Sequence, residues 1–503
     1  MVIANLNTRF RKLAIIAVLI GLLAVSGVYS ALTVSVTIPS SGIIAGNDIT
    51  ALSGSPSDIQ AAVNAVVAAG GGTVHIPAGK FTFNPPVNGI GVTIPYTNVP
   101  IAIIGAGIGQ TILTETQFEG FSTMFARTYS GQSYSAASVR ISGISFAGLV
   151  LTTNLPIGIT DDWNTQDNVG ISLKCTQDFR IDDCSFTNFC GAAIEVADNT
   201  GSAMLVDRGV IDHCSIDNPY RNFVQPYNAT GAYYAVGGYG IIVLGDYYSW
   251  DLNIADYLGQ WNPTTTTNST NCPTGIYGSV VPQPVYIENC NFTQCRHCIS
   301  GNAGAYYVAR YDYFAECYLG ACDMHGYTGN PAPINFGTRG SEVYSNIFNL
   351  TNEAYSGGQD DAWRPRGGGG VFWNNTVYLN NVNGPNACMI MMFNDGEPYP
   401  YDVEQAYVWN NTCNFINGTV TNGDNSIVIY NGGYVANVNY FLFAPNGTNV
   451  NGLTGPTYYT PYTYPLPLTQ TALSSGTTTA SLTLSQDTYL ISASPSRYAR
   501  MMK

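Results

Sequence analysis

The chain repeats a pattern of apolar and polar positions that is eight residues long. Eight copies begin at Val139, Phe179, Gly209, Val285, Tyr307, Ser341, Gly370 and Ala406. The third position is always apolar: Ile141, Ile181, Ile211, Ile287, Ala309, Val343, Phe372 and Val408. The eighth is apolar too, counting Cys413. Because a strand alternates its faces with period two, positions one and three point to one face, and positions two and four to the other.

Successive copies begin 22 to 76 residues apart, most of them 29 to 40 apart. This spacing is typical of a solenoid in which each strand stacks on its counterpart one coil away, at about 4.8 Å. The sixth position reads Ile144, Cys184, Cys214, Cys290, Asp312, Asn346, Asn375 and Asn411. A column of like residues of this kind indicates a ladder at a turn. The repeat therefore predicts an all-β chain of stacked parallel coils.

A single amphipathic helix is predicted before the first strands, from Ser57 to Gly70. Ser57 and Gln60 have the spacing of a capping box, and Gly70 suits a left-handed C-cap. The apolar stripe, spaced as on one helix face, is formed by Ile59, Ala62, Val63, Val66 and Val67. Such a helix would cover the end of an apolar core that otherwise meets water.

These segments resemble a known superfamily. SDIQAAVNAVVAAGGGTVHIPAGKF followed by IAIIGAGIGQTIL is similar to the N-terminal cap and first coils of pectate-lyase-like right-handed parallel β-helices. Within Val285 to Leu350, CRHCISGNAGAYYVAR, DMHG and GTRGSEVYSN further resemble exported β-helix proteins. The resemblance implies a right-handed parallel β-helix and a bias toward polysaccharides. It does not imply one reaction, because a fold does not fix a function.

The domain organisation follows from these signals. Residues 1–30 read as a signal peptide or membrane anchor, because basic residues precede the apolar run Leu13 to Val25. A lead-in at 31–56 and a β-helix at 57–440 follow. Residues 441–503 form a Pro-, Tyr- and Thr-rich segment with one strand-like stretch. Segments 152–169 and 245–284 are too long for simple turns, so we expect excursions there. The predicted location is outside the cell or on its surface.

Composition narrows the partners. The net charge of −14 makes nucleic acid an unsuitable partner, and no segment other than the N-terminal one is long and apolar enough to cross a membrane. Export would allow the twelve cysteines to form disulfides, and buried thiols are the alternative. A subset has metal-like spacing with two histidines, so zinc is a further alternative: Cys295, Cys298, Cys317 and Cys322 with His297 and His325.

The fourth position of the repeat supplies an outward column of candidate binding residues. It reads Ser142, Asp182, Asp212, Glu288, Arg310, Tyr344, Trp373 and Trp409. Asp182, Asp212 and Glu288 are candidate calcium ligands, because carboxylates about 5 Å apart repel each other without a cation. Tyr344, Trp373 and Trp409 are candidate sugar-stacking residues. Ion pairs of Asp182 with Arg140 and Arg180, and packing of the tryptophans beneath a loop, are the alternatives.

A second group of candidates could carry catalysis. Cleavage of an acidic polysaccharide by β-elimination needs a base and a cation that neutralises the uronate carboxylate. Many lyases of the fold that the resemblance implies use Lys or Arg as the base and Ca²⁺ as the cation. The candidate catalytic residues are Arg310, Asp323, His325 and Arg339, with Arg296, His297 and Glu342 as substrate contacts. A histidine is a suitable base because its pKa lies near neutrality. A structural ion-pair network is the alternative.

Two other function classes stay open. Glycoside hydrolysis needs two carboxylates, and Asp360–Asp361 matches one piece of the polygalacturonase pattern, but the rest of that pattern is missing. A non-catalytic surface or envelope protein would account for the scarcity of lysine and the Tyr- and Pro-rich end. The leading hypothesis is a carbohydrate-binding protein with lyase-like activity.

Overall fold

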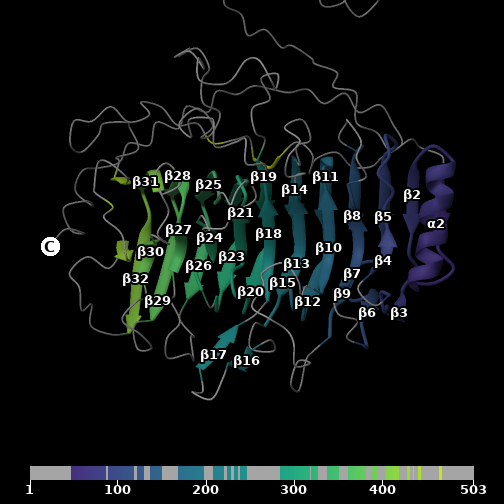
Figure 1. Ribbon diagram of the computed structural model, residues 1–503, viewed down its shortest axis with the longest axis horizontal. Coiled ribbons are helices and arrows are strands. Elements are labelled where there is room, and N and C mark those ends of the chain that lie inside the picture. The colour runs from purple at the N-terminus through teal and green to yellow at the C-terminus, as the bar shows by residue number, and fades with distance from the viewer. Residues whose placement is uncertain are drawn as a thin grey trace, which may run out of the picture. The chain divides into compact units, whose positions relative to one another are not determined.

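Figure 1 shows the computed structural model of the chain. It describes residues 47–86, 89–117, 122–129, 136–149, 168–197, 208–219, 224–227, 232–235, 238–245, 284–317, 319–326, 337–350, 361–380, 388–393, 403–417, 427–430, 434, 440–442, 461 and 464–466. The expected export segment 1–30, most of the two expected excursions and most of residues 441–503 lie outside these ranges. No helix among the described residues is long and apolar enough to cross a membrane.

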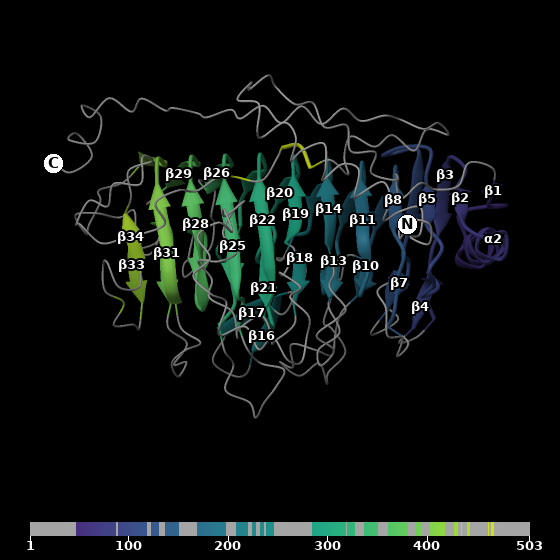
Figure 2. The ribbon, with the colours of Figure 1, turned by 90° about the horizontal axis from the view of Figure 1, so that it is seen from above.

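Three parallel sheets wind into a right-handed parallel β-helix, as the repeat and the resemblance predict (Figures 1 and 2). Each coil gives one strand to sheet A, then one to sheet B, then one to sheet C. Because this order repeats from coil to coil, equivalent residues of successive coils lie side by side.

Sheet A has twelve strands. In spatial order they are β1 (Asp48–Thr50), β2 (Gly72–His75), β5 (Ile101–Ile104), β8 (Val139–Ser142), β11 (Gln177–Asp182), β14 (Arg208–Asp212), β19 (Val285–Glu288), β22 (Tyr306–Arg310), β25 (Gly340–Tyr344), β28 (Gly368–Trp373), β31 (Val403–Trp409) and β34 (Tyr440–Leu442). The first four positions of the eight repeat copies all lie in this sheet.

Sheet B has ten strands: β3 (Gly79–Thr82), β6 (Thr111–Thr114), β9 (Ser145–Ala147), β12 (Ser185–Thr187), β15 (Ser215–Asp217), β20 (Asn291–Thr293), β23 (Tyr313–Ala315), β26 (Ile347–Leu350), β29 (Thr376–Asn380) and β32 (Thr412–Asn417).

Sheet C also has ten: β4 (Ile90–Thr93), β7 (Thr123–Arg127), β10 (Val169–Lys174), β13 (Ala192–Ala197), β18 (Tyr239–Leu244), β21 (Ile299–Asn302), β24 (Cys322–Met324), β27 (Asp361–Pro365), β30 (Cys388–Phe393) and β33 (Ile427–Tyr430). A separate antiparallel pair joins β16 (Val224–Tyr227) and β17 (Ala232–Ala235).

The apolar positions of the repeat form the core, as predicted. Third-position residues pair in register from coil to coil in sheet A, and eighth-position residues do so in sheet B. Both columns belong to one buried cluster. The ring of Phe314 lies 4.9 Å from Phe292 and 4.6 Å from Phe348, in parallel stacks. Burial of these columns is the main stabilising contribution.

The sixth position forms the predicted ladder at the turn from sheet A to sheet B. The amide nitrogens of Asp312, Asn346 and Asn375 donate to the side-chain oxygen one coil further on, at 2.9 to 3.0 Å. The Asn346 side chain also donates to the Ala309 carbonyl of the preceding coil, at 3.0 Å. In the earlier coils a cysteine thiol donates to the preceding coil instead: Cys290 Sγ donates to the Ile211 carbonyl at 3.5 Å.

A feature of the same turn that the sequence did not suggest lies at the fifth position. All eight residues there have left-handed backbone angles, with φ between 49° and 70°: Gly143, Asp183, His213, Asn289, Tyr311, Ser345, Asn374 and Asn410. Only one of them is glycine. The stacked coils hold this conformation through inter-coil bonds such as Ser345 N to the Trp373 carbonyl, 3.2 Å.

Helix α2 (Pro56–Ala68) caps the first coil and buries Ile59, Ala62, Val63 and Val66. The predicted capping box is wrong in detail. Ser55, not Ser57, is the N-cap, and its side chain accepts from the Asp58 amide. Pro56 is the reason, since proline favours the first helical position and leaves the preceding residue as the cap. Gln60 instead bonds both backbone groups of Thr93, at 2.7 and 3.0 Å.

The eleven described cysteines are free thiols, ten of them buried and Cys413 half-buried. Among the described residues no three or more His, Cys, Asp or Glu side chains are grouped as a metal ion would require. Buried thiols, one of the three expectations for these cysteines, are therefore what the described part of the chain mainly contains.

Candidate functional site

The outward column predicted for sheet A exists. Asp182, Asp212, Glu288, Arg310, Tyr344, Trp373 and Trp409 are in-register neighbours from β11 to β31. They face away from the main core, and apolar side chains beside them form a second small cluster that includes Tyr344. Five of the seven are nonetheless buried, and each charged member is paired with an oppositely charged side chain.

Each carboxylate of the column is neutralised by arginine. Asp182 accepts two bonds from Arg140, at 2.7 and 2.6 Å, and Asp212 accepts two from Arg180, at 2.9 and 2.8 Å. Glu288 accepts from Arg310 Nε at 2.9 Å. Bidentate pairs of this kind satisfy most carboxylate lone pairs. The geometry therefore favours the ion-pair alternative, and calcium at Asp182, Asp212 and Glu288 remains a prediction.

The aromatic end of the column is stacked on itself. The Trp373 ring lies 5.0 Å from Tyr344 on one side and 5.6 Å from Trp409 on the other, with interplanar angles of 20° and 1°. A sugar ring stacks on an aromatic face, and both faces of Trp373 are covered by its neighbours. Trp373 can offer a ligand only its edge, so the ladder is better suited to stiffening the coils than to binding sugar.

Arg310 is a fully buried structural cation. Besides Glu288 it bonds the Tyr344 hydroxyl at 2.8 Å, and its guanidinium lies 5.3 Å from the centre of the Tyr286 ring. Burial alone would lower the pKa of Arg310, but Tyr344 and Glu288 more than offset this and raise it. A guanidinium with a raised pKa does not lose its proton, so Arg310 is unsuited to act as a base.

A second polar group lies on sheet C, around β24, and we call it the β24 cluster: Arg296, His297, Asp323, His325, Asp361, Arg364 and Arg366. At its centre Asp323 accepts from Arg366 Nε and Nη2, at 3.0 and 2.7 Å, and from Ser300 at 3.2 Å. Burial would raise the pKa of Asp323, but Arg366 and the two histidines hold it below its usual value. Asp323 is therefore ionised at neutral pH.

The two histidines of the cluster are neutral and share one tautomer. His297 Nδ1 lies 3.0 Å from the Gly320 carbonyl, and His325 Nδ1 lies 2.9 Å from the Gly326 carbonyl. A carbonyl only accepts, so each Nδ1 carries the hydrogen and each Nε2 is the atom that can take up a proton. Burial lowers the pKa of His297 to about 3 and that of His325 to about 4.

Asp361 was discounted as part of an incomplete polygalacturonase pattern, and Arg364 was not among the candidate residues. Arg364 Nε bonds both oxygens of Asp361, at 3.3 and 3.0 Å, and Arg364 stacks in register on Asp323. Burial raises the pKa of Asp361 to about 6 despite the arginine. The signal in the sequence was the unusual density of charge in DDAWRPR, within a chain of few charged residues.

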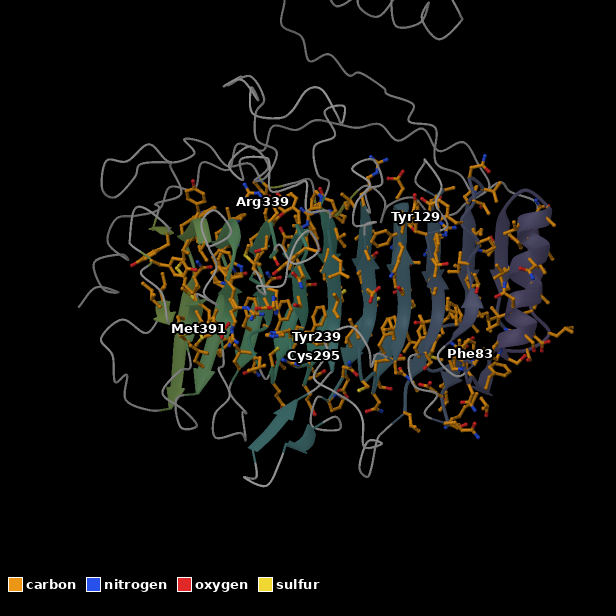
Figure 3. All side chains as sticks on the ribbon, in the orientation of Figure 1. Phe83, Tyr129, Tyr239, Cys295, Arg339 and Met391 are labelled. Atoms are coloured by element: carbon orange, nitrogen blue, oxygen red, sulfur yellow. The ribbon has the colours of Figure 1, made fainter. Side chains whose placement is uncertain are left out.

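The predicted catalytic residues are divided between two faces. Asp323 and His325 belong to the β24 cluster, whereas Arg310 is on sheet A. Glu342, on β25 of sheet A, accepts a hydrogen bond from the Tyr306 hydroxyl. Arg339 is buried just before β25, where the chain passes from sheet C to sheet A. In Figure 3 Arg339 lies at the upper edge of the strands, whereas Tyr239, whose ring lies 5.6 Å from His297, lies in their lower half.

Comparison with known proteins identifies the family. Residues 47–300 match the family model described as rhamnogalacturonase A/epimerase, pectate lyase-like, which is just over half of the chain. The chain belongs to this family. The match begins at the first described residue and includes the capping helix, Asp182, Asp212, Glu288, Arg296 and His297. It ends before Asp323, so most of the β24 cluster lies beyond the part that defines the family.

Several solved structures match this member of the rhamnogalacturonase A/epimerase family at low sequence identity. An alginate lyase from Paenibacillus sp. is 13% identical, with 76% of this chain and 98% of that chain covered and a TM-score of 0.42. The mannuronan C-5 epimerase AlgE6 A-module of Azotobacter vinelandii is 14% identical, with 78% and 93% covered and a TM-score of 0.39.

A tailspike protein mutant of E. coli bacteriophage HK620, in complex with a pentasaccharide, is 13% identical, with 77% and 57% covered and a TM-score of 0.47. Similarity at this level carries no information about activity. A search of curated proteins found no match.

Proposed function

We propose that this protein is a carbohydrate-active β-helix protein that acts on an anionic extracellular polysaccharide at the β24 cluster, in the manner of a lyase. One observation carries the proposal. Two neutral imidazoles, each with Nε2 as its basic atom, lie among three arginines and two aspartates in a chain whose net charge is −14. The family description, which names a rhamnogalacturonase and an epimerase, supports a carbohydrate ligand.

The chemistry of the cluster suits β-elimination. His325 Nε2, which is unprotonated at neutral pH because burial lowers the pKa of His325 to about 4, would take the proton from the carbon beside a uronate carboxylate. The electron pair of that C–H bond would form the new carbon–carbon double bond, and the glycosidic oxygen would leave and take a proton from solvent. Arg296 and Arg366 are half-buried, so they are the cluster's cations nearest to solvent and suit the substrate carboxylate. Asp323 would hold Arg366 in place.

An activity screen tests the proposal. The purified protein is incubated with uronate and neutral polysaccharides, with and without Ca²⁺, while unsaturated products and reducing ends are followed in parallel. We expect unsaturated products that disappear in His325→Ala and persist in His75→Ala, a matched change at a histidine whose side chain is 45% exposed on the first coil. Unsaturated products that persist in His325→Ala would contradict the assignment.

The same screen separates hydrolysis from elimination. Asp361, with its pKa raised to about 6, and Asp323, held ionised, have the split pKa values of an acid and a base. Reducing ends without unsaturated products, lost in Asp361→Asn, would replace the lyase by a hydrolase at the same cluster.

A non-catalytic surface protein is the second candidate, and burial favours it. Asp323 and Asp361 are 0% exposed, and His297 and His325 are 2% and 5% exposed. A cluster so enclosed has the features of a structural ion-pair network. Retention of the protein by a polysaccharide gel, with no product from any polymer of the panel, would support this function over the enzyme.

A further inference from the structure

The outer face of sheet A between β19 and β25 carries a segment from the far end of the chain. Residues 464–466 lie beside β19 in both ribbon views, as the yellow trace (Figures 1 and 2). They are about 175 residues away in sequence from the strand they touch. We propose that this face is a docking site for a peptide with the sequence Tyr-Pro-Leu, and that the chain's own residues 464–466 fill it.

Tyr464 makes the aromatic part of the contact. Its hydroxyl donates to Asn289 Oδ1 at 2.6 Å, and its ring centre lies 3.7 Å from that of Tyr311. Its ring also lies 5.3 Å from the Arg310 guanidinium, on which the Tyr286 ring lies at the same distance. The Arg310 guanidinium therefore lies near aromatic rings of the coils and near one ring of the docked segment.

Leu466 makes one polar and one apolar contact with the same face. Its amide nitrogen donates to Glu288 Oε2 at 3.2 Å, the oxygen that is not engaged by Arg310. Its side chain packs on the second apolar cluster, formed by Val210, Tyr286, Val308 and Tyr344. The docked segment thus supplies a donor to Glu288 Oε2, and an apolar cover for the cluster beside it.

The two contacts explain why charges on the outside of a sheet are buried. Glu288 and Arg310 are both 0% exposed although they face away from the main core. A buried ion pair is stabilising only when its remaining hydrogen-bonding groups are satisfied, and Leu466 and Tyr464 contribute to that. Main-chain donation, an aromatic contact and an apolar contact are together the features of peptide recognition rather than of sugar recognition. The inference does not depend on the proposed activity at the β24 cluster.

A peptide-binding experiment tests the site. The full chain with Tyr464→Ala and Leu466→Ala loses both anchoring side chains, and its fold is checked by circular dichroism. A fluorescent peptide of residues 461–467 should bind this variant and not the unchanged protein. Replacing the peptide's tyrosine by alanine should weaken binding about tenfold, the equivalent of one lost stacking and hydrogen-bonding contact.

Two further measurements make the result decisive. Adding Tyr311→Ala to the double variant should weaken binding by no more than the loss of the peptide's tyrosine does, up to about tenfold, whereas adding Tyr313→Ala, an exposed change on sheet B, should leave binding unchanged. In the unchanged protein the Leu466 amide should be protected from hydrogen exchange. No binding to a folded double variant, equal binding to the unchanged protein, or an unprotected Leu466 amide would each overturn the proposal.

Discussion

Asp312 occupies a place in the turn ladder that its neighbours fill with asparagine, and Asp312→Asn should stabilise the protein. Asp312 Oδ1 accepts from the Cys290 amide at 2.7 Å. Oδ2 is buried and makes no hydrogen bond to any residue that the structure describes. In the next coil the corresponding Asn346 nitrogen donates to the Ala309 carbonyl, at 3.0 Å. The asparagine at 312 would gain the equivalent donation to the Ile287 carbonyl.

The size of the stability gain from Asp312→Asn, and its dependence on pH, follow from this geometry. Burial, and next the Cys290 thiol, raise the pKa of Asp312 well above its usual value. Between an unfolded pKa of about 4 and the raised folded pKa, the unfolded chain releases a proton that the folded one keeps, so stability falls as pH rises. Removing a buried unsatisfied oxygen is worth about 1–3 kcal/mol. We expect a gain of that size at pH 7.5 and little gain at pH 3.5.

Urea unfolding at the two pH values measures the effect. The reciprocal change Asn346→Asp is the control, because it places the same unpaired oxygen one coil further on and should destabilise with the same pH dependence. An Asp312→Asn variant that is no more stable than the unchanged protein at pH 7.5, or equally stabilised at both pH values, would refute the reasoning.

Other parts of the fold give further expected outcomes. Arg310→Met should lower the free energy of unfolding by about 3–5 kcal/mol, because it leaves Glu288 buried without its cation. Arg208→Met removes a half-exposed ion pair with Asp178 and should change the free energy of unfolding by about 1 kcal/mol or less. Phe314→Ala should cost about 3–5 kcal/mol by opening the phenylalanine column, and its exposed neighbour Tyr313→Ala much less. Both pairs are compared by urea unfolding. Stability should also fall as pH drops from about 6.5 toward the lowered pKa values of His297 and His325, about 3 and 4, because only the unfolded chain takes up protons in that range. The double variant His297→Asn, His325→Asn should show a flatter dependence of unfolding free energy on pH, and an unchanged dependence would contradict this prediction.

The repeat was enough to predict the fold, because each column is set by a period that the sequence shows directly. Residues at equal positions, such as Glu288 and Arg310, were expected to stack, and they do. The candidate site was harder to predict, since closeness in sequence does not give the sheet. Arg310 falls in a repeat copy and therefore on sheet A, whereas Asp323, 13 residues later, comes after two turns and lies on sheet C.

The sequence also could not predict which charged side chains are buried or how they are paired. Nothing in the pattern distinguishes an outward column that meets solvent from one covered by Tyr464 and Leu466. Asp361 was discounted because it lacked the rest of a known motif, yet its pKa depends on enclosure and on Arg364 rather than on a motif. Likewise Ser57 fitted a capping box as well as Ser55 did, and the proline between them decided the cap.

The left-handed fifth position gives one corner of each coil from β8 onward a fixed length. From β8 to β32 each passage from sheet A to sheet B takes two residues, whereas the passage from sheet C to sheet A varies from two, between β10 and β11, to forty, between β18 and β19. Insertions are thus tolerated at one kind of corner and avoided at another. For protein engineering, new loops belong after sheet C strands, where they can grow without shifting the register of the coils that carry them.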